Sequence, residues 1–215
     1  MSNLNVAAIT ERFGGYYNQV TSTKAGSAAL AVFALYVIRK FFQRRKRIAA
    51  RKAWSNPSRE VAVITGGAGI NGLGFATARM MAEQGAKVVI LDLEVADPQA
   101  AAARLGADHL GLVANVTDKA SCEAAVAQIK AKYGRIDVLV NNAGITQPVK
   151  FLDITGSDYD RILDVSLRGT LYASQAVLPV MIAQNSGSIV CISSVSAQRG
   201  GGILGGPHYS AAKAG

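Results

Sequence analysis

The sequence is poor in the residues that build disulfide-rich, collagen-like or disordered proteins. It has only 2 Cys and 5 Pro in 215 residues, and its 22 Gly follow no Gly-X-Y period. Only 17% of the residues are charged while 50% are hydrophobic, which excludes a mainly disordered chain. Cys122 and Cys191 have no His or second Cys at metal-ligand spacing, which argues against a zinc site. We expect both to be reduced residues in an apolar core.

Acidic residues are almost absent from the first part of the chain, and this absence locates the net charge of +9. Residues 1–57 hold ten Lys and Arg but one acid, Glu11, whereas residues 58–215 hold 13 residues of each sign. A neutral second segment has no electrostatic reason to bind a nucleic-acid backbone. We therefore predict an N-terminal segment with its linker over residues 1–57, and a separate domain over residues 58–215.

The N-terminal segment combines a short apolar run with a basic cluster. Residues 25–38 carry no charge, and eight basic residues follow between Arg39 and Lys52. A helix over residues 25–42 would reach about 27 Å, close to the bilayer core of about 30 Å. Basic residues beside such a run fit the positive-inside rule and anionic lipid heads. We expect a membrane-associated protein, anchored through residues 25–42, whose N-terminal helix precedes a domain that faces the cytosol.

Other interpretations of this segment stay open. A cleavable signal peptide would have its basic residues before the apolar run, the reverse of the order here. A mitochondrial transit peptide fits the lack of acids but not the scarcity of Arg in the first 38 residues. A soluble helix packed on the domain needs no membrane, and a nucleic-acid tail explains the charges but not the apolar run. A cytoplasmic or mitochondrial location is the alternative.

From Arg59 onward, short apolar runs alternate with helical patterns. Strands are expected at residues 61–65, 87–92, 109–116, 136–142 and 187–194, and helices at 73–84, 98–104, 118–133 and 157–184. Continuous apolar strands separated by helices favour a parallel sheet that is covered on both faces. The predicted fold class is therefore α/β, a doubly wound, Rossmann-like parallel sheet. Ligands bind such folds beyond the carboxyl ends of the strands.

A glycine-rich loop, TGGAGINGLG, joins the first expected strand to the first helix over residues 65–74. Glycines here let the backbone approach a pyrophosphate, and the helix end adds free N–H groups and a positive dipole. Asp92 ends the second strand, where a carboxylate can accept both ribose hydroxyls of adenosine and would repel a 2′-phosphate. No Arg or Lys lies in the loop or just after Asp92. The cofactor predicted is NAD, with NADP less favoured.

Three further motifs follow in order: NNAG at 141–144, ISS at 192–194, and Tyr209 with Lys213 four residues later. With the loop and Asp92, this order resembles the classical short-chain dehydrogenase/reductase family, and within it the 3-oxoacyl-(acyl carrier protein) reductase-like members. The resemblance covers about residues 59–215. It implies an NAD(P)-dependent oxidoreductase that interconverts a hydroxyl and a carbonyl group of a small molecule by hydride transfer. It also implies homo-oligomers for a complete version.

The resemblance implies a role for each matching residue. Tyr209 exchanges a proton with the substrate oxygen, and Lys213 favours the phenolate and holds the nicotinamide ribose. Ser194 steadies the substrate oxygen, and Ser166 stands where the family commonly has an Asn of a proton relay. The expected cofactor-binding residues are Gly66, Gly72, Leu73, Gly74, Asp92, Asn115, Val116, Asn142, Ala143, Gly144, Tyr209 and Lys213.

Departures from the family pattern suggest a second hypothesis. Gly66 and Gly72 are separated by five residues where the family has three, so two extra residues must bulge from the loop. Asn115 stands at a position that is usually Asp. The sequence stops at Gly215, where the family continues with more strands and a substrate-covering loop, so the expected sheet is incomplete at its C-terminus. The alternative is a catalytically inactive, membrane-anchored partial dinucleotide-binding domain, as a fragment or truncated copy.

Overall fold

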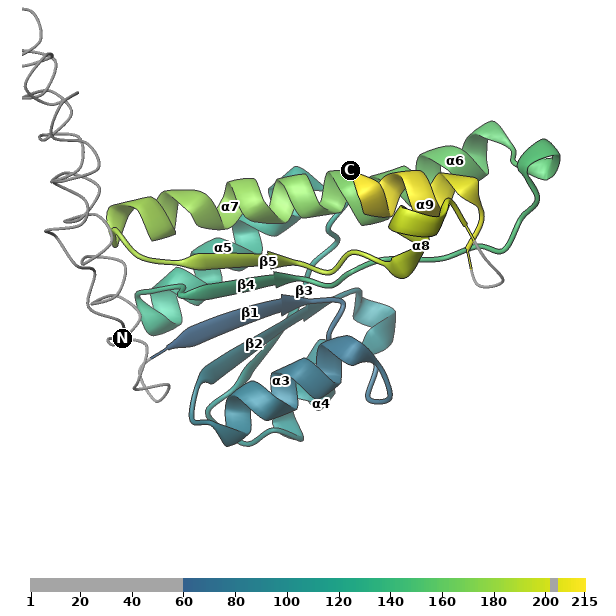
Figure 1. Cartoon of the computed structure of the whole chain (residues 1–215). Helices are drawn as coiled ribbons and strands as arrows, with labels where there is room; N and C mark the ends of the chain where they lie inside the picture. The colour runs from purple at the N-terminus through teal and green to yellow at the C-terminus, as the bar shows by residue number, and fades with distance from the viewer. Residues whose placement is uncertain (1–59, 202–204) are drawn as a thin grey trace, which may run out of the picture. The chain divides into compact units, whose positions relative to one another are not determined.

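The computed structural model describes residues 60–201 and 205–215 (Figure 1). Its strands are β1 (Val61–Thr65), β2 (Lys87–Asp92), β3 (Leu110–Val113), β4 (Val138–Asn141) and β5 (Ser188–Cys191). They form one sheet in the order β3-β2-β1-β4-β5, and every neighbouring pair is parallel. The chain reverses its direction of travel across the sheet between β1 and β4, which is where doubly wound folds bind ligands. The predicted α/β fold is confirmed.

Helices cover both faces of this sheet. On one face lie α3 (Leu73–Glu83) and α4 (Pro98–Ala103), and on the other lie α5 (Lys119–Tyr133) and α7 (Gly169–Ala183) (Figure 1). The shorter elements are η2 (Glu94–Ala96), η3 (Phe151–Asp153), α6 (Gly156–Leu163), η4 (Asp164–Arg168), α8 (Val195–Arg199) and α9 (Pro207–Ala214). The helical stretch predicted at 157–184 is α6, η4 and α7 in direct succession, and η4 is a π turn that the sequence did not predict.

Strand β1 is buried on both sides. Val61 and Val63 belong to the core under α5 and α7, and Ala62 and Ile64 to the core under α3 and α4. All four side chains are at most 2% exposed. Full burial of a Val or Ile side chain contributes about 1.5–3 kcal/mol, so a run such as VAVIT is most stable in the middle of a covered sheet. This packing holds Thr65, the last residue of β1, in a fixed place.

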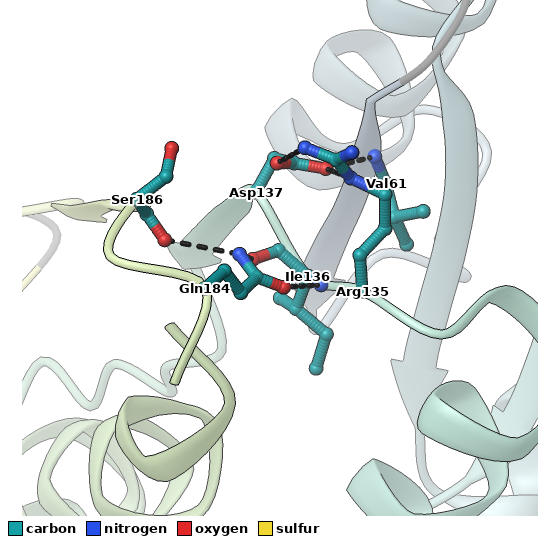
Figure 2. A network of polar contacts seen from close by, with 6 residues as sticks. All are labelled: Val61, Arg135, Ile136, Asp137, Gln184 and Ser186. Carbon is teal, nitrogen blue, oxygen red and sulfur yellow. Dashed lines mark hydrogen bonds and ion pairs between the residues drawn. The ribbon is translucent and has the colours of Figure 1, made fainter. Parts of the chain in front are cut away.

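Polar contacts hold β1 and β4 together at their amino ends (Figure 2). Asp137, 4% exposed, accepts a hydrogen bond from the N–H of Val61 at 2.9 Å and pairs with Arg135 through both carboxylate oxygens at 2.6 and 2.8 Å. The side chain of Gln184, just after α7, accepts from the N–H of Ile136 at 2.9 Å and donates to its carbonyl at 2.7 Å. These contacts fix β4 at the end opposite to the predicted site.

Strands β3, β4 and β5 are all shorter than expected, and one cysteine is misplaced. Strand β3 ends at Val113 because the carboxamide oxygen of Asn115 accepts hydrogen bonds from the N–H and hydroxyl of Thr117, at 3.0 and 2.9 Å, and turns the chain. Strand β5 is an edge strand of the described sheet. Cys122 is buried as predicted, but Cys191 on β5 is exposed, so its placement in the core is wrong.

The predicted anchor at residues 25–42 lies outside the described residues. In residues 60–201 and 205–215, no helix combines the length and apolarity that a membrane crossing needs. The predicted membrane association, with a domain facing the cytosol, is wrong. Its uncharged run has fourteen residues where a span needs about 20, and extending the run to residue 42 adds the charges of Arg39 and Lys40. The domain boundary at residues 57 and 58 stays a prediction.

Candidate functional site

The loop between β1 and α3 packs tightly against the end of β4. Gly66 has a φ of +64°, and a Cβ built on it would lie 2.7 Å from the Cα of Ala143. A Cβ on Gly74, in the first turn of α3, would lie 2.5 Å from both the Nδ2 of Asn142 and the carbonyl oxygen of Gly66. Glycine is therefore required at both positions. These two glycines let the amino end of α3 approach the NNAG segment.

Thr65 and Asn142 join the ends of β1 and β4. The hydroxyl of Thr65, which is 1% exposed, accepts from the N–H groups of Asn142 and Ala143 at 3.1 and 3.0 Å. The amide of Asn142 donates to the carbonyls of Thr65 and Gly66 at 3.0 and 2.8 Å. The side chain of Asn142 is thus engaged in shaping the loop.

Asp92 lies at the carboxyl end of β2, beside the same loop. Its Oδ2 accepts a hydrogen bond from the N–H of Ala68 and its Oδ1 accepts one from the N–H of Leu93, both at 2.9 Å. Each carboxylate oxygen can accept further hydrogen bonds. The contact with Ala68 holds Asp92 in place, and it could not be predicted from the sequence because Ala68 contributes only its backbone.

A cleft of about 360 Å³ runs from Asp92 to the NNAG segment. The predicted cofactor residues that line it are Gly66, Asp92, Asn115, Val116, Asn142, Ala143 and Gly144. The carboxamide oxygen of Asn115 accepts hydrogen bonds from Thr117, so this oxygen stabilises its own turn rather than binding a nucleotide base. The cleft therefore gathers most of the predicted residues at the carboxyl edge of the sheet.

The other glycine-loop residues lie at the start of α3. Gly72 is the residue before the helix, and its N–H donates to the carbonyl of Gly69 at 2.8 Å. Ile70 and Asn71, between these two glycines, lie in this tight turn and are exposed. Leu73 is 75% exposed. Gly72, Leu73 and Gly74 lie at the amino end of α3 and are not part of the cleft wall.

Lys213, on α9, reaches back to the sheet. Its Nζ donates to the carbonyl of Ile192 at 2.7 Å and lies 3.1 Å from a Cβ built on Gly144. Burial lowers the pKa of Lys213, against a smaller opposing effect of Cys191. The hydroxyl of Ser193 donates to the carbonyl of Lys213 at 2.7 Å. Two residues of the ISS motif, Ile192 and Ser193, thus hold α9 near the end of β5.

Ser166 approaches the same glycine from the π turn. Its side chain is 4% exposed, and its Oγ lies 3.6 Å from the Cβ position of Gly144. This hydroxyl has no hydrogen-bond partner in the described part of the chain. A buried polar atom without a partner commonly marks a place for water or ligand, and π turns are frequent at functional sites.

Ser194 and Tyr209 complete the predicted catalytic set. The hydroxyl of Ser194 accepts from the N–H of Ser196 at 3.1 Å and so begins α8. The ring of Tyr209 is half-buried and lies against Gly205. Among the described residues, no hydrogen bond joins Tyr209 to Ser194 or Lys213. The structure therefore brings Lys213, Ser166 and Gly144 together, and carries Tyr209 on the helix of Lys213.

The contacts of Gln147, which lies three residues after the NNAG segment, were not predicted from the sequence. Its carbonyl accepts from the N–H of Gly206 at 2.8 Å, and its amide donates to Asp158 at 2.7 Å. The partners are 59 and 11 positions away in the chain, so no local pattern relates them. Its place just after NNAG was the available signal.

Comparison with known proteins decides the family. The family model described as short chain dehydrogenase matches residues 60–215. The chain belongs to the short-chain dehydrogenase family. The family consists of oxidoreductases that use NAD(H) or NADP(H). The motif order of the sequence and the described fold both agree with this match.

Among short-chain dehydrogenases, three relatives indicate the range of similarity. The chain is 52% identical over 161 residues to an uncharacterized short-chain type dehydrogenase/reductase, y4mP, of Sinorhizobium fredii. It is 41% identical to acetoacetyl-CoA reductase of Synechocystis and 37% identical to 3-oxoacyl-(acyl-carrier-protein) reductase FabG of Escherichia coli, each over 156 residues. Each alignment covers 73% of this chain and 60–63% of the relative, so the chain spans less than two thirds of their length.

Proposed function

We propose that residues 60–215 form the NAD-binding and catalytic part of an oxidoreductase that interconverts a hydroxyl and a carbonyl group. One observation carries this proposal: Lys213 and Ser166 both approach Gly144, at the edge of the cleft that reaches Asp92. A cation, a buried hydroxyl that has no partner in the described part of the chain, and a glycine-walled cleft are thus neighbours at the ligand-binding edge of the fold.

The residues present fit a nicotinamide dinucleotide. A Cβ on Gly74 or Gly66 would collide with the loop, so the sequence keeps the backbone open where a pyrophosphate needs close approach. Asp92 would hold the adenosine ribose, Gly144 and its neighbours would line the wall beside the nicotinamide, and Lys213 would hold the second ribose. When bound, the cofactor supplies or accepts the hydride.

In this proposal four side chains divide the remaining work. Tyr209 passes a proton to or from the substrate oxygen, and Ser194 donates a hydrogen bond to that oxygen. Lys213 contributes its ammonium from the same helix, four residues after Tyr209. Ser166 takes the place of the relay Asn, and its shorter hydroxyl reaches less far than an amide would.

The charge of Asp92 supports NAD over NADP. Its carboxylate is fixed by two backbone N–H groups, and no Lys or Arg in the loop could bind a 2′-phosphate. A phosphate placed beside a fixed carboxylate is repelled, and it loses hydration without gaining a partner.

The decisive experiment is Tyr209→Phe, with Tyr172→Phe on α7 as the matched control. Turnover is measured by NADH absorbance with acetoacetyl-CoA as the probe, and NADH binding by calorimetry. We expect Tyr209→Phe to lower turnover at least about 100-fold, the usual scale for an acid–base group, with NADH affinity nearly unchanged. Retained turnover in Tyr209→Phe would remove Tyr209 from its role. A chain that binds neither NADH nor NADPH would defeat the proposed function altogether.

A further inference from the structure

Gln147 contacts two helices that the sequence separates from it. Its carbonyl oxygen accepts from the N–H of Gly206 at 2.8 Å, at the start of α9. Its Nε2 donates to Oδ1 of Asp158 on α6 at 2.7 Å, and its Oε1 faces Nε2 of His208 on α9 at 3.3 Å. One side chain therefore bridges α6 and the first turn of α9, immediately beside Tyr209.

The first turn of α9 depends on this bridge. Gly206 precedes the helix, and no side chain from residues 60–201 or 205–215 caps its amino end. Pro207 has no N–H, and the turn is closed from within by Ser210, whose N–H and hydroxyl both bond the carbonyl of Gly206. The contacts of Gly206 and His208 with Gln147 hold this turn from outside, and Tyr209 is the next residue.

The charge of Asp158 sets the orientation of the whole bridge. Hydrogen bonds from Thr155 and Gln147 hold the pKa of Asp158 at about 2, so its carboxylate accepts and does not donate. The amide of Gln147 must then turn its NH₂ group to Asp158 and its oxygen to His208. His208, 3% exposed, must donate through Nε2, and its buried Nδ1 has no partner among the residues that the structure describes.

We propose that Gln147 is a positioning residue that carries a fixed orientation from α6 to α9 and so sets the place of Tyr209 beside the cleft. The proposal rests on the proposed role of Tyr209 as the proton-transfer residue. Gln147 itself acts through His208 and Gly206, because its amide is engaged by Asp158 and His208 and its carbonyl accepts from Gly206. The bridge is a series of hydrogen bonds that runs from Asp158 on α6 through Gln147 to His208 on α9.

A charge exchange tests the bridge. Gln147→Glu places two carboxylates in contact, so the bridge opens. Adding Asp158→Asn gives an amide donor opposite the new carboxylate, which can accept from it and from His208, so the bridge closes again. We expect Gln147→Glu to lower turnover of acetoacetyl-CoA about 10-fold or more, since small displacements of catalytic groups cost that much. The double variant recovers to within about threefold, while Gln147→Glu with Asp160→Asn, a neighbouring exposed residue of α6, does not recover.

A second readout reports the position of Tyr209 without turnover. The chain is labelled with 3-fluorotyrosine, and the fluorine signal of Tyr209 is assigned by its loss in Tyr209→Phe. The signal moves in Gln147→Glu and returns in the double variant, with NADH affinity unchanged in both. A signal that does not move, or a double variant that stays impaired, overturns the proposal. A fall of melting temperature and NADH affinity together with turnover shows a merely structural role and overturns it too.

The two proposals fail in different ways. If Tyr209→Phe keeps its turnover, the proposed function of Tyr209 is lost whatever Gln147 does. If Tyr209→Phe is inactive but Gln147→Glu keeps both turnover and the fluorine signal, only the positioning role is lost.

Discussion

The N–H of Ala68 donates a hydrogen bond to Oδ2 of Asp92 at 2.9 Å, and the two residues are 24 positions apart. The contact joins the glycine-rich loop to the end of β2. A rearrangement of that loop would therefore also displace the carboxylate, so the proposed phosphate and ribose contacts would change together.

Cofactor choice follows from the charge at this point. Asp92→Asn keeps an oxygen that can accept from Ala68 but removes the negative charge. We expect the preference for NADH over NADPH, measured by calorimetry, to fall about tenfold, the effect of a repulsion of about 1.4 kcal/mol at a partly exposed site. Asp97→Asn is the control, because Asp97 begins α4 and does not line the cleft. A preference that stays unchanged in Asp92→Asn would place cofactor selection elsewhere.

Gly74→Ala tests the close approach of α3 to the NNAG segment. Helix propensity alone would favour Ala by about 1 kcal/mol, yet the new Cβ would lie 2.5 Å from Asn142 and Gly66. We expect the collision to prevail, with NADH affinity lowered at least about tenfold. Gly156→Ala, at the start of α6, has open space around its Cβ and should leave NADH binding as it was. Normal NADH binding by Gly74→Ala would show that the loop can move apart without loss.

Local sequence predicted the elements well and the contacts between them poorly. The runs VAVIT and KVVILD match β1 and β2 at both ends, because a buried parallel strand is apolar throughout and a glycine or charge ends it. The apolar run at 109–116 was read too long, since hydrophobicity continues past Val113 although Asn115 has already turned the backbone. The π turn was missed because its residues have ordinary helical character.

Asp137→Ala tests the network at the amino ends of β1 and β4. The change leaves the N–H of Val61 without its acceptor and Arg135 without its ion pair. Loss of a buried acceptor costs about 1–3 kcal/mol, and we expect that decrease in the free energy of unfolding by urea titration. Glu123→Gln removes a surface pair with Lys119 whose side chains are both more than half exposed, and should change stability by less than about 0.5 kcal/mol. Equal effects of the two substitutions would contradict this account.

Acid should weaken the fold through Asp158. The pKa of its carboxyl is lowered to about 2 in the folded chain by hydrogen bonds from Thr155 and Gln147, against about 3.9 when unfolded. Its contribution is therefore complete above about pH 4 and is lost as the pH falls through about 2. Asp158→Asn removes this titration. We expect its unfolding free energy to vary less than that of the parent chain between pH 4 and 2, and parallel curves would refute the assignment.

The candidate site was partly visible in the sequence. The glycines, Asp92 and the NNAG segment were predicted as a group because the ends of parallel strands meet at one edge. Gly66, Asp92 and residues 142–144 do line one cleft, whereas Gly72 and Gly74 lie at the start of α3, outside the cleft wall. The meeting of Ser166 with Lys213 at Gly144 depends on the path of α6, η4 and α7, which no spacing encodes. The hydrogen bonds of Gln147 could not be predicted for the same reason, because the fold alone brings their partners together.

The π turn Asp164–Arg168 also fixes the rotational phase of the long helix. The N–H of Gly169 bonds the carbonyl of Asp164, five residues back, so the turn holds one residue more than an α-turn. Each residue advances an α-helix by about 100°. Deleting one residue here would rotate the buried stripe of Ala173 and Val177 out of step with α6. The length of this turn thus sets how α7, which packs on the sheet, is rotated relative to α6 and the helices around Tyr209.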